Sequence, residues 1–154
     1  MRNLRFRFRR WWLALLLGFS LAIFLAWGQV GSSTPEQIAP QTLMTRLEAG
    51  TAPLILDVRS PAEYTAGHIP TAVNIPYREV PQRWPELAEF TDEMVVYCEV
   101  GIRAAIAERI LEQTGFQQIV TLAGDMRGWR AAGLPLSPPV PGQDTINSIK
   151  KLSK

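Results

Sequence analysis

The fold is decided by the stretch Met94-Val95-Val96-Tyr97-Cys98-Glu99-Val100-Gly101-Ile102-Arg103. Its first four residues are apolar and predict a buried strand, and a helical pattern begins at Arg103. Cys98, the only cysteine in the chain, leaves the strand into a tight loop that Gly101 permits. Backbone N–H groups at a helix N-terminus stabilise an anion, so this position favours a reactive thiolate. The stretch indicates a cysteine-based enzyme, and the simpler alternative is a buried structural cysteine.

Short apolar runs alternate with helical patterns along the rest of the chain. Further strands are predicted at 54–58, 72–75 and 119–122, and helices at 40–49, 86–90, 103–114 and 127–132. Ser60 and Glu63 flank a proline in the pattern of a helical capping box. Apolar strands alternating with helices predict an α/β fold whose parallel sheet is covered on both faces. Sites in such folds lie at the carboxyl ends of the strands, where Asp57 and Cys98 are expected.

Charge is unevenly distributed along the 154 residues. Five arginines lie in the first ten residues, whereas residues 29–154 hold 11 Lys and Arg against 14 Asp and Glu, a formal charge of −3. A nucleic-acid-binding surface on the folded part is therefore not expected. One cysteine and one histidine exclude an intramolecular disulfide and a cysteine-rich or multi-histidine metal site. We expect no metal.

The N-terminal segment has the pattern of a membrane or export signal. Residues 11–27 are 17 consecutive apolar or small residues, about 25 Å as a helix, which is short for a bilayer span. The arginines before this run predict a cytoplasmic N-terminus and a domain on the extracytoplasmic side. Two outcomes stay open: a single-pass transmembrane anchor, or a signal peptide cleaved after Gly28, which would release the protein into the periplasm. Residues 29–34 are then a linker and 139–154 a flexible tail.

Several further motifs follow the order and spacing of a known family. They are Asp57-Val58-Arg59-Ser60-Pro61-Ala62-Glu63-Tyr64, Gly67-His68-Ile69-Pro70-Thr71-Ala72-Val73-Asn74-Ile75-Pro76, Val96-Tyr97-Cys98 with Gly101 and Arg103, and Leu122-Ala123-Gly124 with Trp129 and Gly133-Leu134-Pro135. Through these motifs, residues 35–138 resemble a single-domain rhodanese. The resemblance implies a five-stranded parallel sheet flanked by helices, and sulfurtransferase activity through a cysteine persulfide without a cofactor.

The resemblance also implies roles for particular residues. They are Cys98 as the sulfur-accepting nucleophile, Glu99, Val100, Gly101, Ile102 and Arg103 as the substrate-binding loop, and Asp57, Arg59 and His68 as supporting residues. For His68 a structural bracing role is favoured over a base, because a lone loop histidine usually serves as a hydrogen-bonding brace. Trp129 is expected to pack in the core.

The loop length and two acidic residues bear on the substrate. The loop from Cys98 to Arg103 has the form C-x4-R, whereas related phosphatases and arsenate reductases use a longer C-x5-R loop. The shorter ring of amides suits a single sulfur atom better than a tetrahedral oxyanion. Glu99 directly after the cysteine, and Asp125 in place of a common glycine, add negative charge near the site. Both are expected to disfavour thiosulfate as the physiological donor.

The predicted reaction moves a sulfane sulfur from thiosulfate or a persulfide to a thiophilic acceptor through a Cys98 persulfide, with Arg103 supplying positive charge. The expected partners are small sulfur donors, thiol acceptors and the membrane that holds the N-terminal helix. Two other functions stay open. One is a non-catalytic, membrane-tethered rhodanese-like interaction module, and the other is an exported thiol redox protein, which would need a partner thiol.

Overall fold

A computed structural model describes residues 36–90 and 92–137 of the chain. Its strands form one sheet in the order β1-β5-β4-β2-β3, and every neighbouring pair is parallel. They are β1 (Gln37–Ile38), β2 (Leu54–Asp57), β3 (Val73–Asn74), β4 (Met94–Tyr97) and β5 (Ile119–Leu122). The predicted five-stranded parallel sheet is confirmed.

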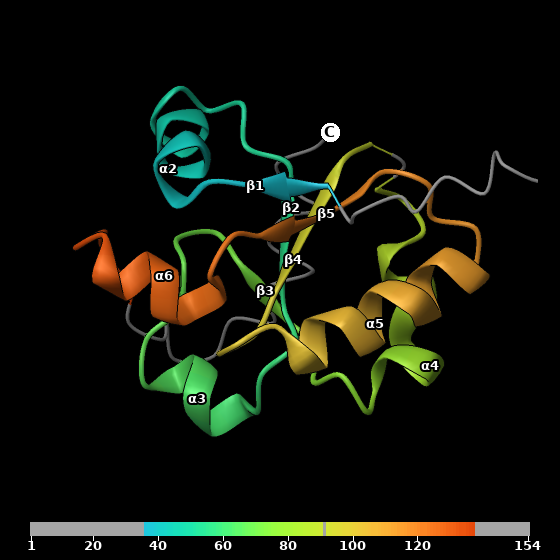
Figure 1. Cartoon of the computed structure of the whole chain (residues 1–154). Helices are drawn as coiled ribbons and strands as arrows, with labels where there is room; N and C mark the ends of the chain where they lie inside the picture. Colours follow the sequence, from blue (N-terminus) through green and yellow to red (C-terminus); the bar gives the residue numbers. More distant parts are fainter. Residues whose placement is uncertain (1–35, 91, 138–154) are drawn as a thin grey trace, which may run out of the picture. The chain divides into compact units, whose positions relative to one another are not determined.

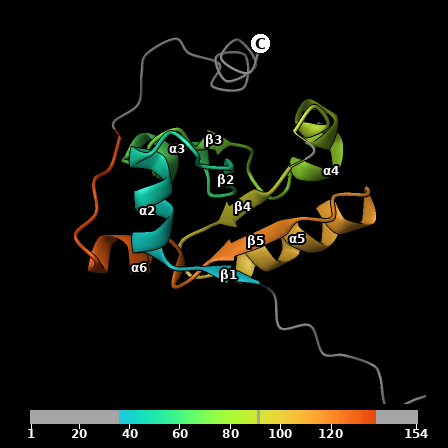
Figure 2. The ribbon, with the colours of Figure 1, turned by 90° about the horizontal axis from the view of Figure 1, so that it is seen from above.

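Helices cover both faces of this sheet. They are α2 (Pro40–Glu48), α3 (Pro61–Thr65), α4 (Val80–Arg83), the 3-10 helix η1 (Trp84–Leu87), α5 (Ile102–Gln113) and α6 (Asp125–Ala131). Helices α4 and α5 lie on one side of the sheet, and α2 and α6 lie on the other (Figures 1 and 2). Each side has its own buried apolar cluster, one around Leu111 of α5 and one around Trp129 of α6.

Strand β4 shows how the sheet divides these two clusters. Met94 and Val96 pack in the cluster of α5, and Val95 and Tyr97 pack in the cluster of α2 and α6. The alternation follows from the two-residue period of a strand. Cys98 comes next and belongs to the cluster of α5. The same alternation therefore places the Cys98 side chain on the face of the sheet that α5 covers.

The helices between β3 and β4 differ from the prediction. The helix predicted at 86–90 is wrong, because the chain instead forms α4 followed directly by η1. Each begins with a proline in its first turn, Pro81 in α4 and Pro85 in η1. Proline fits the first turn of a helix because the N–H that it lacks has no partner there. The two prolines thus start helical turns rather than interrupt them.

The capping box at the start of α3 is confirmed. The Ser60 Oγ accepts a hydrogen bond from the Glu63 N–H at 3.3 Å, and the Ser60 N–H donates to Glu63 Oε2 at 3.0 Å. This reciprocal pair fixes the position of Glu63, whose carboxylate reaches the site described below.

The predicted N-terminal helix, the linker at 29–34 and the tail at 139–154 lie outside the described residues. In the described ranges 36–90 and 92–137, every helix is too short or too polar to cross a bilayer. The fate of the N-terminal segment stays a prediction.

Candidate active site

Cys98 lies where β4 ends and α5 begins. Its side chain is buried, and the Gly101 N–H donates a hydrogen bond to the sulfur at 3.1 Å. Gly101 is the N-cap of α5 and has a φ of 92°, which few residues other than glycine adopt. The N–H groups of the first helical turn have no acceptor within the helix, and the helix dipole is positive at this end. The loop therefore favours negative charge on the Cys98 sulfur.

Arg103 on α5 is held by Glu63 on α3. The Arg103 Nη1 and Nη2 donate to Glu63 Oε2 and Oε1, both at 2.7 Å, in a bidentate pair. The hydrogen bonds from Arg103 hold the pKa of Glu63 well below its usual value, and those to Glu63 raise the pKa of Arg103. The anion that Arg103 meets at hydrogen-bond distance is the Glu63 carboxylate of α3, a residue outside the loop. The positive charge of Arg103 is therefore shared between Glu63 and the Cys98 sulfur, which also raises the Arg103 pKa.

Asp57 and Arg59 form a fully buried ion pair behind the loop. The Arg59 Nη2 donates to Asp57 Oδ2 at 2.6 Å and to the Gly67 carbonyl at 2.9 Å. The Tyr97 hydroxyl donates to the same Asp57 oxygen at 2.7 Å, as the pairing of Asp57 with Tyr97 in the sheet allows. Burial lowers the pKa of Arg59, but Asp57 outweighs it and leaves that pKa raised. Burial raises the pKa of Tyr97 well above its usual value, and the Asp57 charge adds to the rise.

Glu99 faces two cations. Its Oε1 accepts a hydrogen bond from Arg130 Nη1 at 2.6 Å, and its Oε2 lies 3.7 Å from Arg59 Nη1. That Arg59 nitrogen is buried and makes no hydrogen bond with any residue that the structure describes. Glu99 thus provides the charge nearest to an otherwise unpartnered guanidinium nitrogen. The negative charge directly after the cysteine is therefore present, and it is paired with Arg130 and faces Arg59.

Asp125 approaches Cys98 from the other side of the loop. Its Oδ1 accepts a hydrogen bond from the Cys98 N–H at 2.8 Å, and a Cβ built on Gly101 would lie 3.0 Å from its Oδ2. Burial raises the pKa of Asp125, and the Glu99 charge adds to the rise, while interactions with the Cys98 backbone and side chain oppose it. The expected acid near the site is therefore present, buried, and in contact with the cysteine.

The sequence model of the family described as "Rhodanese-like domain" matches residues 39–132, which include all of this geometry. The chain belongs to the rhodanese-like domain family. It is 34% identical over 104 residues to a protein of Allochromatium vinosum named sulfurtransferase, and the match covers 68% of this chain and 96% of that protein.

Two further similarities agree with the fold of this rhodanese-like domain. The chain is 37% identical over 98 residues to the YrkF protein of Bacillus subtilis, covering 64% of this chain but only 52% of that protein. This chain thus spans about half the length of some of the curated relatives that it matches. The crystal structure of the Alr3790 protein from Anabaena sp. is similar with a TM-score of 0.66 and 28% identity, covering 76% of this chain and 94% of that one.

His68 braces the rhodanese-like domain. Its Nδ1 lies 3.1 Å from the Tyr64 carbonyl, and its ring stacks on the Tyr64 ring with centroids 3.8 Å apart. Its backbone pairs with Ser137 through two hydrogen bonds of 3.2 and 2.8 Å. Burial lowers the pKa of His68, while the bond to the Tyr64 carbonyl opposes this shift. These contacts tie the loop before β3 to the end of the domain, as a structural brace does.

Three residues of the site have no role in the sequence-based prediction. They are Glu63, Tyr97 and Arg130, the partners of Arg103, Asp57 and Glu99. The sequence placed Glu63 in part, because the capping box pattern predicts that its carboxylate turns back toward the start of α3. The position of Tyr97 directly before Cys98 could have indicated that it lies close to the site. Arg130 carried none, because its partner lies 31 residues away on another element.

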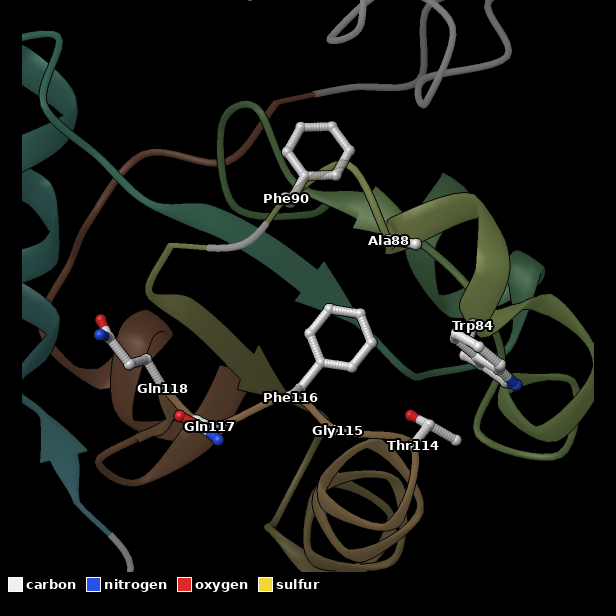
Figure 3. Close-up of a pocket in the computed structure, with 8 residues that line it drawn as sticks. All are labelled: Trp84, Ala88, Phe90, Thr114, Gly115, Phe116, Gln117 and Gln118. Atoms are coloured by element: carbon white, nitrogen blue, oxygen red, sulfur yellow. The ribbon is translucent and has the colours of Figure 1, made fainter.

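A hollow of about 250 Å³ lies away from these residues, at the amino ends of β4 and β5 (Figure 3). The side chains of Trp84, Phe90 and Phe116 line it, none of its eight labelled residues is charged, and its one hydroxyl, on Thr114, donates to the Leu111 carbonyl. Cys98 lies at the opposite, carboxyl end of β4. Because group transfer needs a nucleophile and charge stabilisation, we assign the chemistry to Cys98 rather than to the hollow.

Proposed function

We propose that this chain is a sulfurtransferase in which Cys98 carries the transferred sulfur as a persulfide. The observation that carries the proposal is the hydrogen bond from the Gly101 N–H to the Cys98 sulfur at the amino end of α5. The same N–H groups that favour a thiolate there also stabilise the terminal sulfur anion of a persulfide. The names of relatives that include "sulfurtransferase" support the same chemistry.

The reaction takes two steps. The Cys98 thiolate attacks the outer sulfur of thiosulfate or of a persulfide, and a bond forms between the two sulfurs. The donor's own bond to that sulfur breaks, and the remainder of the donor leaves with the electron pair. A thiophilic acceptor, such as a thiolate or cyanide, then attacks the outer sulfur and releases the Cys98 thiolate. This is ping-pong covalent catalysis, and it uses only the chain's own residues.

The size of the loop supports sulfur as the transferred group. The six residues from Cys98 to Arg103 turn directly into α5, which begins at Ile102. Arg103 is held by two hydrogen bonds to Glu63, so both of its terminal nitrogens are oriented toward that carboxylate rather than left free to surround a tetrahedral oxyanion. A single sulfur atom at the end of the Cys98 side chain needs fewer donors than a phosphate group.

One observation favours the interaction module as a second candidate. Val100 and Ile102, on either side of Gly101, are exposed although they are large and apolar, and Ile106 continues the same face of α5. Exposed apolar side chains beside a site are typical of contacts with another protein. On this interpretation the loop docks a partner and Cys98 carries no sulfur.

Mass spectrometry separates the two functions. The protein is incubated with thiosulfate or with the persulfide of cysteine, and the Cys98 peptide is then weighed without reduction. The proposed function predicts a gain of one sulfur atom on that peptide and none in a Cys98→Ser variant. An unchanged Cys98 peptide with both donors rejects sulfur transfer and favours the module.

We also propose that the domain works on the extracytoplasmic side, either tethered or exported. The support is the sequence alone, with five arginines before the apolar run at 11–27. The intact mass of protein recovered from membranes distinguishes the full chain from one cleaved after Gly28. Recovery of the uncleaved chain in the cytosolic fraction, protected from external protease, would contradict the proposal.

A further inference from the structure

Asp125 brings a carboxyl group to the nucleophile, and the mechanism above gives it no task. Its Oδ1 accepts the Cys98 N–H, and its Oδ2 lies over Gly101, the residue whose N–H binds the Cys98 sulfur. The two carboxyl oxygens thus lie against the backbone of the loop that holds the Cys98 sulfur. The side chain is 8% exposed, so bulk water does not compete freely for it.

The backbone at Asp125 is in a conformation that suits glycine. Its φ is 53°, one of two positive φ values among the non-glycine residues that the structure describes. Aspartate tolerates this region better than most residues, but glycine adopts it without strain. A glycine would therefore satisfy the backbone at the start of α6, and the carboxyl is an addition that the turn does not require.

The surroundings favour the protonated carboxyl more than water does. Burial raises the pKa of Asp125, the neighbouring Glu99 charge adds to the rise, and the hydrogen bond from the Cys98 N–H opposes it. Glu99 is in turn paired with Arg130 and faces Arg59. Asp125 is consequently suited to hold a proton beside Cys98 and to release it there.

Sulfur donors differ in whether their leaving group needs that proton. Thiosulfate releases sulfite, which is less basic than a thiolate and therefore depends less on being protonated as it leaves. The persulfide of a thiol releases a thiolate, whose conjugate acid has a pKa of about 8.5, and this leaving group departs more easily when it is protonated. The rim of the site agrees with the second class, because Val100 and Ile102 are apolar and Arg103 is engaged by Glu63.

We propose that Asp125 is a catalytic proton donor and that the sulfur donor is the persulfide of a thiol rather than thiosulfate. The inference deepens the proposed function and rests on it. The Cys98 thiolate attacks the outer sulfur of R–S–S⁻, the bond between the donor's two sulfurs breaks, and the Asp125 carboxyl protonates the leaving sulfur. The products are Cys98–S–S⁻, R–SH and the Asp125 carboxylate, so two negative charges and one transferable proton stand on each side. In the second half-reaction an acceptor thiol attacks the outer sulfur of Cys98–S–S⁻. The proton of this thiol passes to Asp125 and restores its carboxyl group.

The test compares three donors that separate charge from leaving-group basicity. They are the persulfide of cysteine, methanethiosulfonate, which is a monoanion with a weakly basic leaving group, and thiosulfate, which is a dianion with a weakly basic leaving group. The rate of Cys98 loading is measured for the wild type and for Asp125→Asn. Asparagine keeps an oxygen for the Cys98 N–H and tolerates a positive φ, but its amide cannot supply the proton.

The expected result is a change in a ratio. In Asp125→Asn, the loading rate with the persulfide, divided by that with methanethiosulfonate, falls at least about tenfold, because general acid catalysis contributes about 100-fold or more. Asp125→Gly, which removes the carboxyl and takes a positive φ freely, shows the same fall. The matched control Asp92→Asn changes an exposed acid in the segment before β4 and keeps the wild-type ratio.

Each of the other outcomes leads to a single conclusion about Asp125 or about the proposed function. A ratio within twofold of the wild-type value in both Asp125 variants would show that the carboxyl only positions the loop, and would overturn the inference. A rise with thiosulfate alone, with the other two donors equal, would show that Asp125 acts only by charge repulsion, and would also overturn it. Failure of the wild type to load sulfur from any donor would instead reject the proposed function.

Discussion

The two edges of the sheet differ in what they place beside the strand ends. The cysteine edge, at the carboxyl ends, holds Cys98 and Asp125 with the ion pairs Arg103–Glu63 and Arg130–Glu99. The aromatic edge, before β4 and β5, holds the hollow lined by Trp84, Phe90 and Phe116. Both edges carry ion pairs, since Arg46 and Glu93 lie 2.6 Å apart just before β4, but the nucleophile and the fully buried pair Arg59–Asp57 are at the cysteine edge.

Under the proposed function, strand direction rather than the position of a hollow decides where the chemistry lies. At the carboxyl end of a parallel strand the next helix begins, so its free N–H groups and its dipole face the loop. At the amino end the preceding helix has ended, and its free carbonyl groups repel an anion. If this account is right, equivalent substitutions at the two edges have different effects on sulfur transfer.

The largest effect is expected from Cys98→Ser. A hydroxyl at this position is a far weaker nucleophile toward sulfur than a thiolate, so sulfur transfer should fall by at least about 1,000-fold. The steady-state rate of thiocyanate formation from thiosulfate and cyanide measures this loss. The far-ultraviolet circular dichroism spectrum should stay unchanged, and a variant that retains more than a tenth of the rate would refute the role of Cys98.

Arg59→Met tests the buried charges of the cysteine edge. Removing the guanidinium leaves the Asp57 carboxylate fully buried without its ionic partner, which should lower the free energy of unfolding by about 3–5 kcal/mol. The matched control Arg130→Met removes an exposed cation and should lower it by less than about 1 kcal/mol. Urea unfolding measures both. Equal losses in the two variants would mean that the buried pair is not a structural support of the site.

Two glycines allow the same substitution at both edges. Gly101→Ala and Gly115→Ala each force a residue with a side chain into a positive φ, of 92° and 103°, and each should lower the free energy of unfolding by about 1–2 kcal/mol. Of the two, only the Gly101 Cβ meets a neighbour, Asp125 Oδ2 at 3.0 Å, whereas no atom of residues 36–90 or 92–137 lies within 4 Å of the Gly115 Cβ. Gly101→Ala alone should therefore slow sulfur transfer, by about tenfold. Equal rates in the two variants would remove the contrast between the edges.

The smallest expected effect is the pH dependence of the Arg103–Glu63 pair. Hydrogen bonds from Arg103 lower the pKa of Glu63, so the pair stabilises the folded state fully above the usual value of 4.5 and loses this contribution as pH falls through the lowered pKa. The pair is partly exposed, so wild type and Glu63→Gln should differ by no more than about 1 kcal/mol at pH 7. Urea unfolding between pH 3 and 7 should show this difference shrinking below pH 4.5. A difference that is constant with pH would contradict the assigned ionic contact.

Much of the fold was predictable because its strands are short and apolar on both faces. The runs at β2, β4 and β5 are visible in the sequence, and Gly101 and Cys98 mark the loop between β4 and α5. Strand β1 has only two residues, so no periodicity identifies it, and its presence followed from the family resemblance alone. The prolines of α4 and η1 are compatible with either the start of a helix or a break in one. Only the burial of Val80 and Leu87 in the core decides between the two.

The sequence identified candidate residues for the site but not how they pair. Cys98 and the loop after it were identified from the strand–loop–helix pattern. The electrostatic partners were not, since Glu63 and Arg103 lie 40 residues apart and meet only when α3 and α5 are in place. Glu99 shows the consequence, because its charge looks unfavourable in the sequence, whereas in the fold it forms an ion pair with Arg130.

The central claim is that sulfur passes through Cys98, and a single-turnover experiment tests it most directly. The protein is loaded with one sulfur atom per chain, freed of donor, and mixed with cyanide. The account predicts one equivalent of thiocyanate, formed at the same rate as the Cys98 peptide returns to its unloaded mass. Thiocyanate that forms while the Cys98 peptide keeps its mass, or a loaded peptide that transfers nothing to cyanide, would contradict it.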